Sequence, residues 1–174
     1  METDSKYNFQ WKDLGDIDLG RPKLGPTTLV AVYRLMQYTM RDVIEKQLGP
    51  KRTNDIFIEA GHKAGMEFCK NVLDTTLDFN GFVANLTENL LNFSIGLLRI
   101  EKADMDNFSF IITVSEDLDC SGLPYGGVTV CDYDEGFLAG ILHVYTGKNF
   151  TVKEIDCWGT GERTCRFAVE MISE

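Results

Sequence analysis

Three cysteines and one glutamate in the last quarter of the chain have the residue types of a metal site. They are Cys131, Glu154, Cys157 and Cys165. Zn²⁺ binds thiolate sulfurs at about 2.3 Å and carboxylate oxygens at about 2.0–2.2 Å, and four such ligands complete its tetrahedron. Two alternatives stay open, because cysteine is often a small buried apolar residue and two facing cysteines can form a disulfide. The ligand types favour a metal site over both.

The sequence around these residues predicts a β-hairpin that brings two of the cysteines together. Residues 150–157 alternate between apolar and polar side chains, as in a strand, and residues 164–171 form a second such segment after a glycine-containing turn. The hairpin places Cys157 and Cys165 near its tip. Cys131 can reach them from the start of the preceding segment.

Spacing alone does not select the carboxylate ligand. Glu154 lies three residues before Cys157, so the two side chains share a face only if the strand bulges or is already turning. Strand alternation puts Asp156 on the same face as Glu154. Either carboxylate is therefore compatible with the hairpin.

The remaining segments predict helices first and strands mostly later. Apolar residues recur at helical spacing in several segments, and β-branched, alternating segments follow. We expect helices over 26–48, 53–73, 80–93 and 130–145, and strands over 94–102, 107–115, 150–157 and 164–171. This order predicts an α+β fold in which N-terminal helices pack on a four-stranded antiparallel sheet. We expect residues 1–25 to form an N-terminal arm and residues 26–174 to form one domain.

Two pairs of glycines have the spacing of a close helix contact. Gly61 and Gly65 lie in one predicted helix, and Gly136 and Gly140 lie in another. Residues four apart share one face of a helix, and the missing side chain lets a second backbone approach. Tight helix packing is the interpretation we favour for the first pair.

Composition restricts the class of protein. The chain has 174 residues, of which 44% are hydrophobic and 25% charged, as in an ordinary soluble globular domain. Its 17 basic and 27 acidic residues give a net charge of −10, which disfavours nonspecific binding to nucleic acid or to an anionic membrane. No apolar run approaches the roughly 20 residues of a membrane span. The polar first residues and the odd number of cysteines, five, lead us to expect a cytoplasmic protein without disulfides.

The segment from Gly126 to Phe167 resembles the 4-vinyl reductase domain family. In the shared pattern, a cysteine opens a helix that carries two glycines four apart. A glycine turn follows, then Glu-x-x-Cys, and then a further cysteine eight residues later with Arg-Phe or a similar pair after it. The resemblance is specific over residues 120–167, and it implies for the whole chain the α+β fold that this family shares with subunits of the TRAPP transport complexes.

The resemblance also implies a ligand set and a function. In the aromatic-sensing relatives, three cysteines and a glutamate hold zinc, and these positions fall on Cys131, Glu154, Cys157 and Cys165. Four protein ligands leave no position open for a substrate, so such a zinc ion is structural. The family encloses a pocket for small hydrophobic molecules. We therefore expect a zinc-containing, sensor-type domain that binds such a molecule and forms a homodimer.

The expected pocket is lined by apolar residues of the third helix, the strands behind it and the helix after Cys131. The candidates are Phe82, Leu86, Phe93, Phe108, Phe110, Phe137 and Ile141. Aromatic-sensing relatives grip the phenol hydroxyl with a histidine and a tryptophan, and by approximate spacing those places hold Phe82 and Phe110 here. Phenylalanine donates no hydrogen bond, so a lipid chain or a hydrocarbon fits this chain better than phenol.

Two cysteines lie outside the resembling ligand set. Cys69 follows apolar residues on a predicted helix and is expected to be a core thiol. Cys120 follows an acidic stretch and precedes a glycine-rich loop, so we expect it to be exposed, and a redox role with a metal-site thiol or a second subunit stays open.

Two alternative functions stay open beside the sensor. One is an enzyme or accessory factor in the reduction of a tetrapyrrole vinyl group, for which the sequence shows no site for nicotinamide, flavin or an iron–sulfur cluster. The other is a protein-interaction adaptor with a vestigial pocket. A tightly held ligand distinguishes the sensor from the adaptor.

Overall fold

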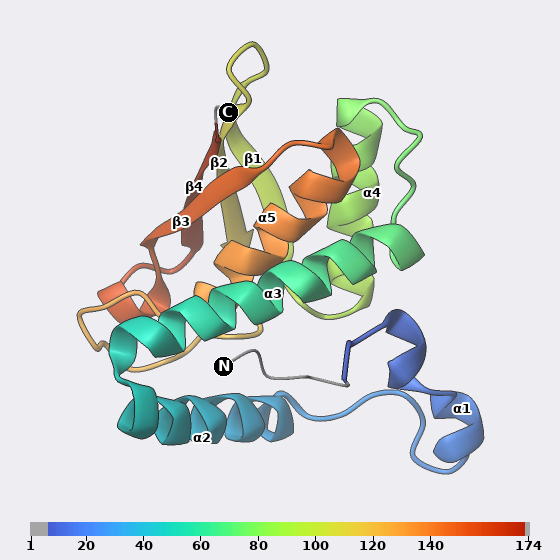
Figure 1. The fold of residues 1–174 in the computed structure, drawn as a ribbon, viewed down its shortest axis with the longest axis vertical. Coiled ribbons are helices and arrows are strands. Elements are labelled where there is room, and N and C mark those ends of the chain that lie inside the picture. Colours follow the sequence, from blue (N-terminus) through green and yellow to red (C-terminus); the bar gives the residue numbers. More distant parts are fainter. Residues whose placement is uncertain (1–6, 173–174) are drawn as a thin grey trace.

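A computed structural model describes residues 7–172 as an antiparallel sheet covered on one face by helices (Figure 1). The four strands pair in the order β1-β2-β4-β3. Their bounds are β1 Leu97–Asp104, β2 Ser109–Ser115, β3 Phe150–Asp156 and β4 Cys165–Met171. The predicted α+β class and the four-stranded antiparallel sheet are both confirmed.

Five α-helices accompany the sheet in the described residues. They are α1 Ile17–Gly20, α2 Val30–Leu48, α3 Pro50–Val72, α4 Phe79–Asn92 and α5 Asp132–Thr146. The main boundary difference is the start of α3, which includes Pro50 because proline fits the first turn of a helix, where no N–H donor is needed. None of the helices in residues 7–172 is both long and apolar enough to span a membrane.

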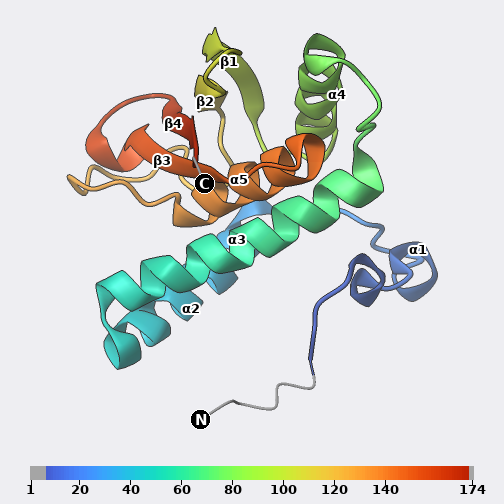
Figure 2. The ribbon, with the colours of Figure 1, turned by 45° about the horizontal axis from the view of Figure 1, so that its top comes forward.

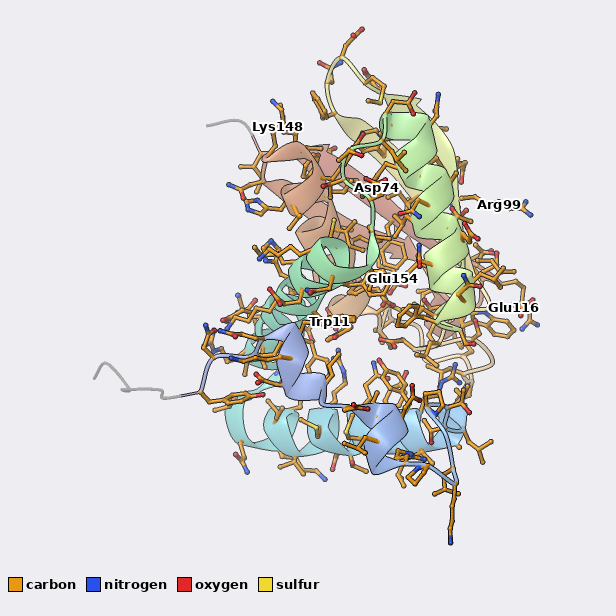
Figure 3. All side chains as sticks on the ribbon, turned by 90° about the vertical axis from the view of Figure 1, so that its right-hand side faces the viewer. Trp11, Asp74, Arg99, Glu116, Lys148 and Glu154 are labelled. Carbon is orange, nitrogen blue, oxygen red and sulfur yellow. The ribbon has the colours of Figure 1, made fainter. Side chains whose placement is uncertain are left out.

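The helices form successive layers below the sheet. Helices α4 and α5 lie against the sheet, α3 crosses α5, and α2 lies beyond α3, as the two ribbon views agree (Figures 1 and 2). A short 3₁₀ helix, η1 (Trp11–Leu14), leads into α1. Trp11 packs edge-on against Phe68 of α3, and its backbone N–H donates to the Glu67 carboxylate (Figure 3). The described part of the predicted arm therefore contains helical turns and contacts α3, while residues 1–6 of that arm lie outside the described residues.

The crossing of α3 and α5 depends on the two glycine pairs. A Cβ atom on Gly61 or Gly65 would overlap a backbone carbonyl of α5, at Tyr133 or Phe137. A Cβ atom on Gly136 of α5 would in turn overlap the Ile58 carbonyl of α3. Backbone against backbone leaves no room for relaxation, so the predicted tight packing is confirmed and gives α5 a fixed position over the sheet.

Helix α2 turns its polar face inward. Gln37 is buried, and the guanidinium of Arg34 donates to the carbonyls of Leu118, Ser121 and Asp117 in the loop that follows β2. The apolar face is directed outward instead, and six side chains on it or at its first turn are more than half exposed: Leu29, Val32, Leu35, Met36, Met40 and Val43. A helix with this orientation presents an apolar face that residues 7–172 leave largely uncovered.

Candidate metal centre and adjoining cavities

Four cysteine sulfurs converge at one end of the sheet. Cys131 precedes α5, Cys157 follows β3, Cys165 begins β4, and Cys120 lies in the loop after β2. Their Sγ atoms all lie within 4.8 Å of one another, and none of the four residues is more than 1% exposed. None forms a disulfide, since all five cysteines of the chain are free. Four buried free thiols at this spacing form a group that suits a metal ion.

The distances between the sulfurs are close to those of a tetrahedral zinc site. Zinc–sulfur bonds of about 2.3 Å place the sulfurs of a tetrahedron about 3.8 Å apart. The Sγ of Cys131 lies 3.8 Å from that of Cys157 and 3.9 Å from that of Cys165. The Cys120 and Cys165 sulfurs are closer, at 3.0 Å. The cluster therefore fits a metal ion after a small outward movement of Cys120.

The prediction that Cys120 is exposed is wrong, since its side chain is fully buried. The cause is a turn made by Asp117, whose Oδ1 accepts hydrogen bonds from the N–H groups of Asp119 and Cys120, at 2.8 and 3.0 Å. Aspartate often folds the backbone in this way. The Asp-x-Asp-Cys sequence contains that signal, but the direction in which the turn points is decided by the elements packed around it.

The predicted bulge in the strand before Cys157 is present. The pairing of β3 with β4 shifts register between Glu154 and Asp156. Glu154 is buried inside the molecule, as Figure 3 shows, whereas Asp156 is partly exposed and pairs with Arg166 at 2.6 Å. Of the two carboxylates that spacing left open, Glu154 is therefore the one beside the cysteine cluster.

Glu154 is held by the backbone that leads into α5. Its Oε2 accepts hydrogen bonds from the N–H groups of Val130 and Cys131, at 3.1 and 3.0 Å. Its Oε1 is buried and has no hydrogen-bond partner among residues 7–172. Burial raises the pKa of this carboxyl to about 8, because the charged form loses its hydration. Glu154 is not a member of the group of four whose ligand atoms all lie within 4.8 Å of one another.

Hydrogen bonding in the cluster favours a thiolate at one position. Bonds from the Cys120, Cys131 and Cys165 thiols lower the pKa of Cys157 well below that of an ordinary thiol. The N–H of Gly159, in the turn η2 (Trp158–Thr160), also donates to the Cys157 sulfur at 3.4 Å. Metal ions bind thiolates rather than thiols, so Cys157 is prepared to be a ligand.

Most residues of the predicted ligand pocket pack as core. The ring of Phe82 stacks on that of Tyr145 with centroids 3.8 Å apart, and Phe110 stacks on Phe79 at 5.4 Å. Leu86 and Ile141 are buried with them in the same core. Phe108 is partly buried beneath Lys148, and Phe93 is 51% exposed at the end of α4. These positions are accounted for by packing, and the ligand role predicted for them stays a prediction.

Two cavities lie instead between α2, α3 and the start of α5. The larger holds about 220 Å³ and is almost entirely apolar; its lining includes Met36, Met40, Ile44, Ile56 and Phe57. The smaller holds about 160 Å³ and includes Ile95, Leu118, Asp119, Asp134 and Phe137. Tyr33 and Tyr133 line both cavities, so the two adjoin. Phe137 is the member of the predicted pocket set that lines one of them.

The smaller cavity is close to the cysteine loop and carries buried acid groups. Asp119, which precedes Cys120, accepts hydrogen bonds from Tyr33 and Gln37 of α2, at 2.8 and 2.6 Å. The Oδ2 of Asp134 is buried without a partner among the described residues, and burial raises the pKa of this carboxyl well above its usual range. The sequence did not indicate these cavities, because their walls come from three helices that are far apart in the chain.

Comparison with known proteins agrees with the motif and the fold. The family model of the 4-vinyl reductase domain matches residues 110–171. An uncharacterised protein of Methanocaldococcus jannaschii is 27% identical over 150 residues, which is 86% of this chain and 82% of the relative.

Three solved structures have a similar fold at low sequence identity. The phenol-responsive sensory domain of the transcription activator PoxR, solved with phenol, has a TM-score of 0.62 at 14% identity, covering 83% of this chain and 75% of that one. A vinyl-4-reductase family protein of Methanocaldococcus jannaschii has a TM-score of 0.56 at 19% identity, covering 87% and 86%. Subunit 3 of the trafficking protein particle complex of Naegleria fowleri, covalently bound to palmitic acid, has a TM-score of 0.66 at 13% identity, covering 83% and 95%. Residues 110–171, which contain β3, β4, α5 and the cysteines from Cys120 onward, thus belong to the 4-vinyl reductase domain family, and the chain has the fold that these proteins share.

Proposed function

We propose that this protein is a sensor-type domain that binds a small hydrophobic molecule beside a structural zinc ion. The observation that carries the proposal is the position of the two adjoining cavities. They are lined mainly by apolar residues, and Asp119 connects the smaller cavity directly to the loop of Cys120. A ligand in this space would contact the α2 side chains that hold the loop.

The size and lining of the cavities support a small apolar ligand. A dry cavity of about 150 Å³ holds benzene in another protein, so spaces of about 160 and 220 Å³ suit molecules of that order. Methionine side chains in the wall adapt to different shapes. PoxR binds phenol and the Naegleria subunit carries palmitic acid, which support a ligand of this class on the same fold. Both cavities are small beside a tetrapyrrole, so they do not favour the vinyl-reduction alternative.

Zinc is the metal that the donor set suits best. Cys131, Cys157 and Cys165 would hold it, and either Glu154 or Cys120 would complete the tetrahedron. With four protein ligands the ion supplies folding free energy and has no open position for Lewis-acid chemistry. It would join the start of α5 to the hairpin of β3 and β4, and so fix the wall of the cavities.

Native mass spectrometry of the purified protein, with metal analysis on the same sample, tests the proposal. We expect one zinc ion per chain and an additional organic mass that is released by denaturation. Zinc without any organic mass, even after exposure to a mixture of small aromatics and fatty acids, would overturn the ligand-binding role and leave the metal role standing.

We also propose that two copies of the chain associate through the apolar face of α2. Six large apolar side chains along one helix form a patch of the kind that marks protein interfaces. A second copy is the occupant we favour because two such faces complement each other across a two-fold axis.

The same apolar face supports the adaptor as a second candidate function. In that case the occupant of the face would be a different protein. A monomeric protein that purifies without a ligand and fails to take one up would favour the adaptor over the sensor.

A further inference from the structure

We infer that Cys120 is the fourth ligand of the metal in this chain, and that Glu154 supports the site from outside the coordination sphere. The inference rests on the metal part of the proposed function and is independent of the hydrophobic ligand. It assigns a role to a residue that the family ligand set leaves out.

The positions of the sulfurs carry the first step. Among the described residues, the group with all ligand atoms mutually within 4.8 Å contains the four cysteines and omits Glu154. Each of the four cysteines is completely or almost completely buried. Cys120 could remain outside the coordination sphere only as an uncoordinated thiol packed 3.0 Å from the sulfur of the ligand Cys165. That distance is shorter than the tetrahedral spacing of about 3.8 Å, which places Cys120 in the coordination sphere rather than behind it.

The hydrogen bonds of Glu154 carry the second step. Its Oε2 is engaged by two backbone N–H groups, those of Val130 and of the ligand Cys131. A carboxylate in this arrangement fixes the backbone of a ligand, which is the usual task of a residue that surrounds a metal site. The position also accounts for why a buried carboxylate is tolerated next to thiolates, since two donors compensate its charge.

The support of the Cys120 loop carries the third step. Asp117 holds the N–H of Cys120, and α2 holds the same loop from outside through Arg34, Tyr38 and Tyr33. Arg34 contributes three hydrogen bonds to backbone carbonyls, at 2.7, 2.9 and 3.3 Å. A loop fixed from both sides presents its cysteine in one position, as a preorganised ligand does. Through Cys120, the metal would therefore connect α2 to the hairpin.

X-ray absorption at the zinc edge of the intact protein tests the assignment directly. We expect a first shell of four sulfur atoms at about 2.3 Å. Three sulfur atoms and one oxygen atom at about 2.0 Å would overturn the inference and restore Glu154 as the ligand, while leaving the zinc site and the ligand-binding role in place. A protein that binds no zinc would overturn both this inference and the zinc part of the proposed function.

Two matched variants and one control extend the test to solution. In the cobalt-substituted protein, Cys120→Ser should reduce the sulfur-to-cobalt charge-transfer absorbance by about a quarter, since one of four thiolates is lost. Glu154→Gln should leave this absorbance unchanged, and so should Cys69→Ala, which removes a buried thiol outside the cluster. The opposite pattern, with Glu154→Gln altering the spectrum and Cys120→Ser preserving it, contradicts the inference. If Cys120→Ser does not fold, the zinc-edge measurement on the unchanged protein decides the question.

Discussion

At the residue scale, the centre depends on thiols that are distant in the chain. Cys120 and Cys165 are separated by 45 positions, yet their sulfurs lie 3.0 Å apart in a buried cluster. Such sulfurs gain little from hydrogen bonding to one another, since S–H is a weak donor and sulfur a weak acceptor. A metal ion would make each of them a strong ligand, and the free energy of binding would become free energy of folding.

Replacing one ligand of the cluster is expected to remove the metal. In Cys157→Ser, the zinc content should fall from one ion per chain to near zero, and the melting temperature should drop by about 10 °C or more, which corresponds to a loss of several kcal/mol in a chain of this length. Metal analysis and calorimetry measure the two effects. Cys69→Ala is the control, because it also removes a buried thiol but should retain the zinc. A Cys157→Ser protein with unchanged zinc and melting temperature would show that the cluster is not the metal site.

At the element scale, α2 and α5 are held by different kinds of contact. Helix α5 meets α3 through glycines, backbone against backbone. Helix α2 is held largely by polar side chains on the loop of Cys120, with Tyr33 and Gln37 bound to the Asp119 carboxylate. Close packing is insensitive to the metal, whereas the polar contacts of α2 depend on where that loop lies.

Removal of the metal should therefore loosen α2 before the crossing of α3 and α5. After treatment with a chelator, the amides of residues 117–121 and of α2 are expected to exchange with solvent more rapidly, together with the tip of the hairpin. The amides of α3 and α5 at their crossing should keep their protection and serve as the internal reference. Faster exchange confined to the hairpin of β3 and β4 would contradict the connection through Cys120.

The glycines of the helix crossing give a second prediction at this scale. Gly136→Ala places a methyl group against the carbonyl of Ile58, so the free energy of unfolding should fall by about 3 kcal/mol or more. Gly20→Ala is the matched control, because it lies in α1 with no atom within 4 Å of an added Cβ and without a positive φ. Denaturant unfolding measures both variants. Equal stability of the two would mean that α3 and α5 separate easily and that the crossing does not fix the cavities.

At the scale of the whole molecule, the outward face of α2 is the feature most in need of a partner. Leu35 is 68% exposed in the middle of that face. Its position next to the larger cavity, which Met36 and Met40 also line, places the proposed dimer contact beside the proposed ligand. Binding in the cavity and association of two copies would then act on the same helix.

A charge on this face is expected to separate the copies. Leu35→Glu should convert a dimer into a monomer in sedimentation experiments, because a buried, unpaired carboxylate at an interface costs several kcal/mol. Arg99→Glu introduces the same side chain on an exposed position of β1, where Figure 3 shows Arg99 directed away from the molecule, and should leave the dimer intact. A dimer that survives Leu35→Glu must use another face, and a monomeric unchanged protein would reassign the α2 face to a different partner.

Local patterns in the sequence determined the elements and part of the centre. Hydrophobic periodicity predicted four helices and four strands within a few residues, since the spacing of apolar side chains is set by the geometry of each element. The hairpin tip brought Cys157 and Cys165 together, and the spacing of Glu154 required the bulge that the structure contains. The glycine pairs predicted a close helix contact, because only a missing side chain allows it.

Tertiary structure alone decided which distant segments meet. The buried position of Cys120 depends on α2 and on the Asp117 turn together, and neither is visible from the residues next to that cysteine. The outward apolar face of α2 follows from a polar partner that lies more than 80 positions away, at Asp119. The cavities likewise arise where side chains of three helices fail to fill the space between them. The sequence of one segment fixes its own periodicity but contains no record of its neighbours in space, and for that reason spacing pointed to three of the clustered cysteines whereas the fourth was found only in the fold.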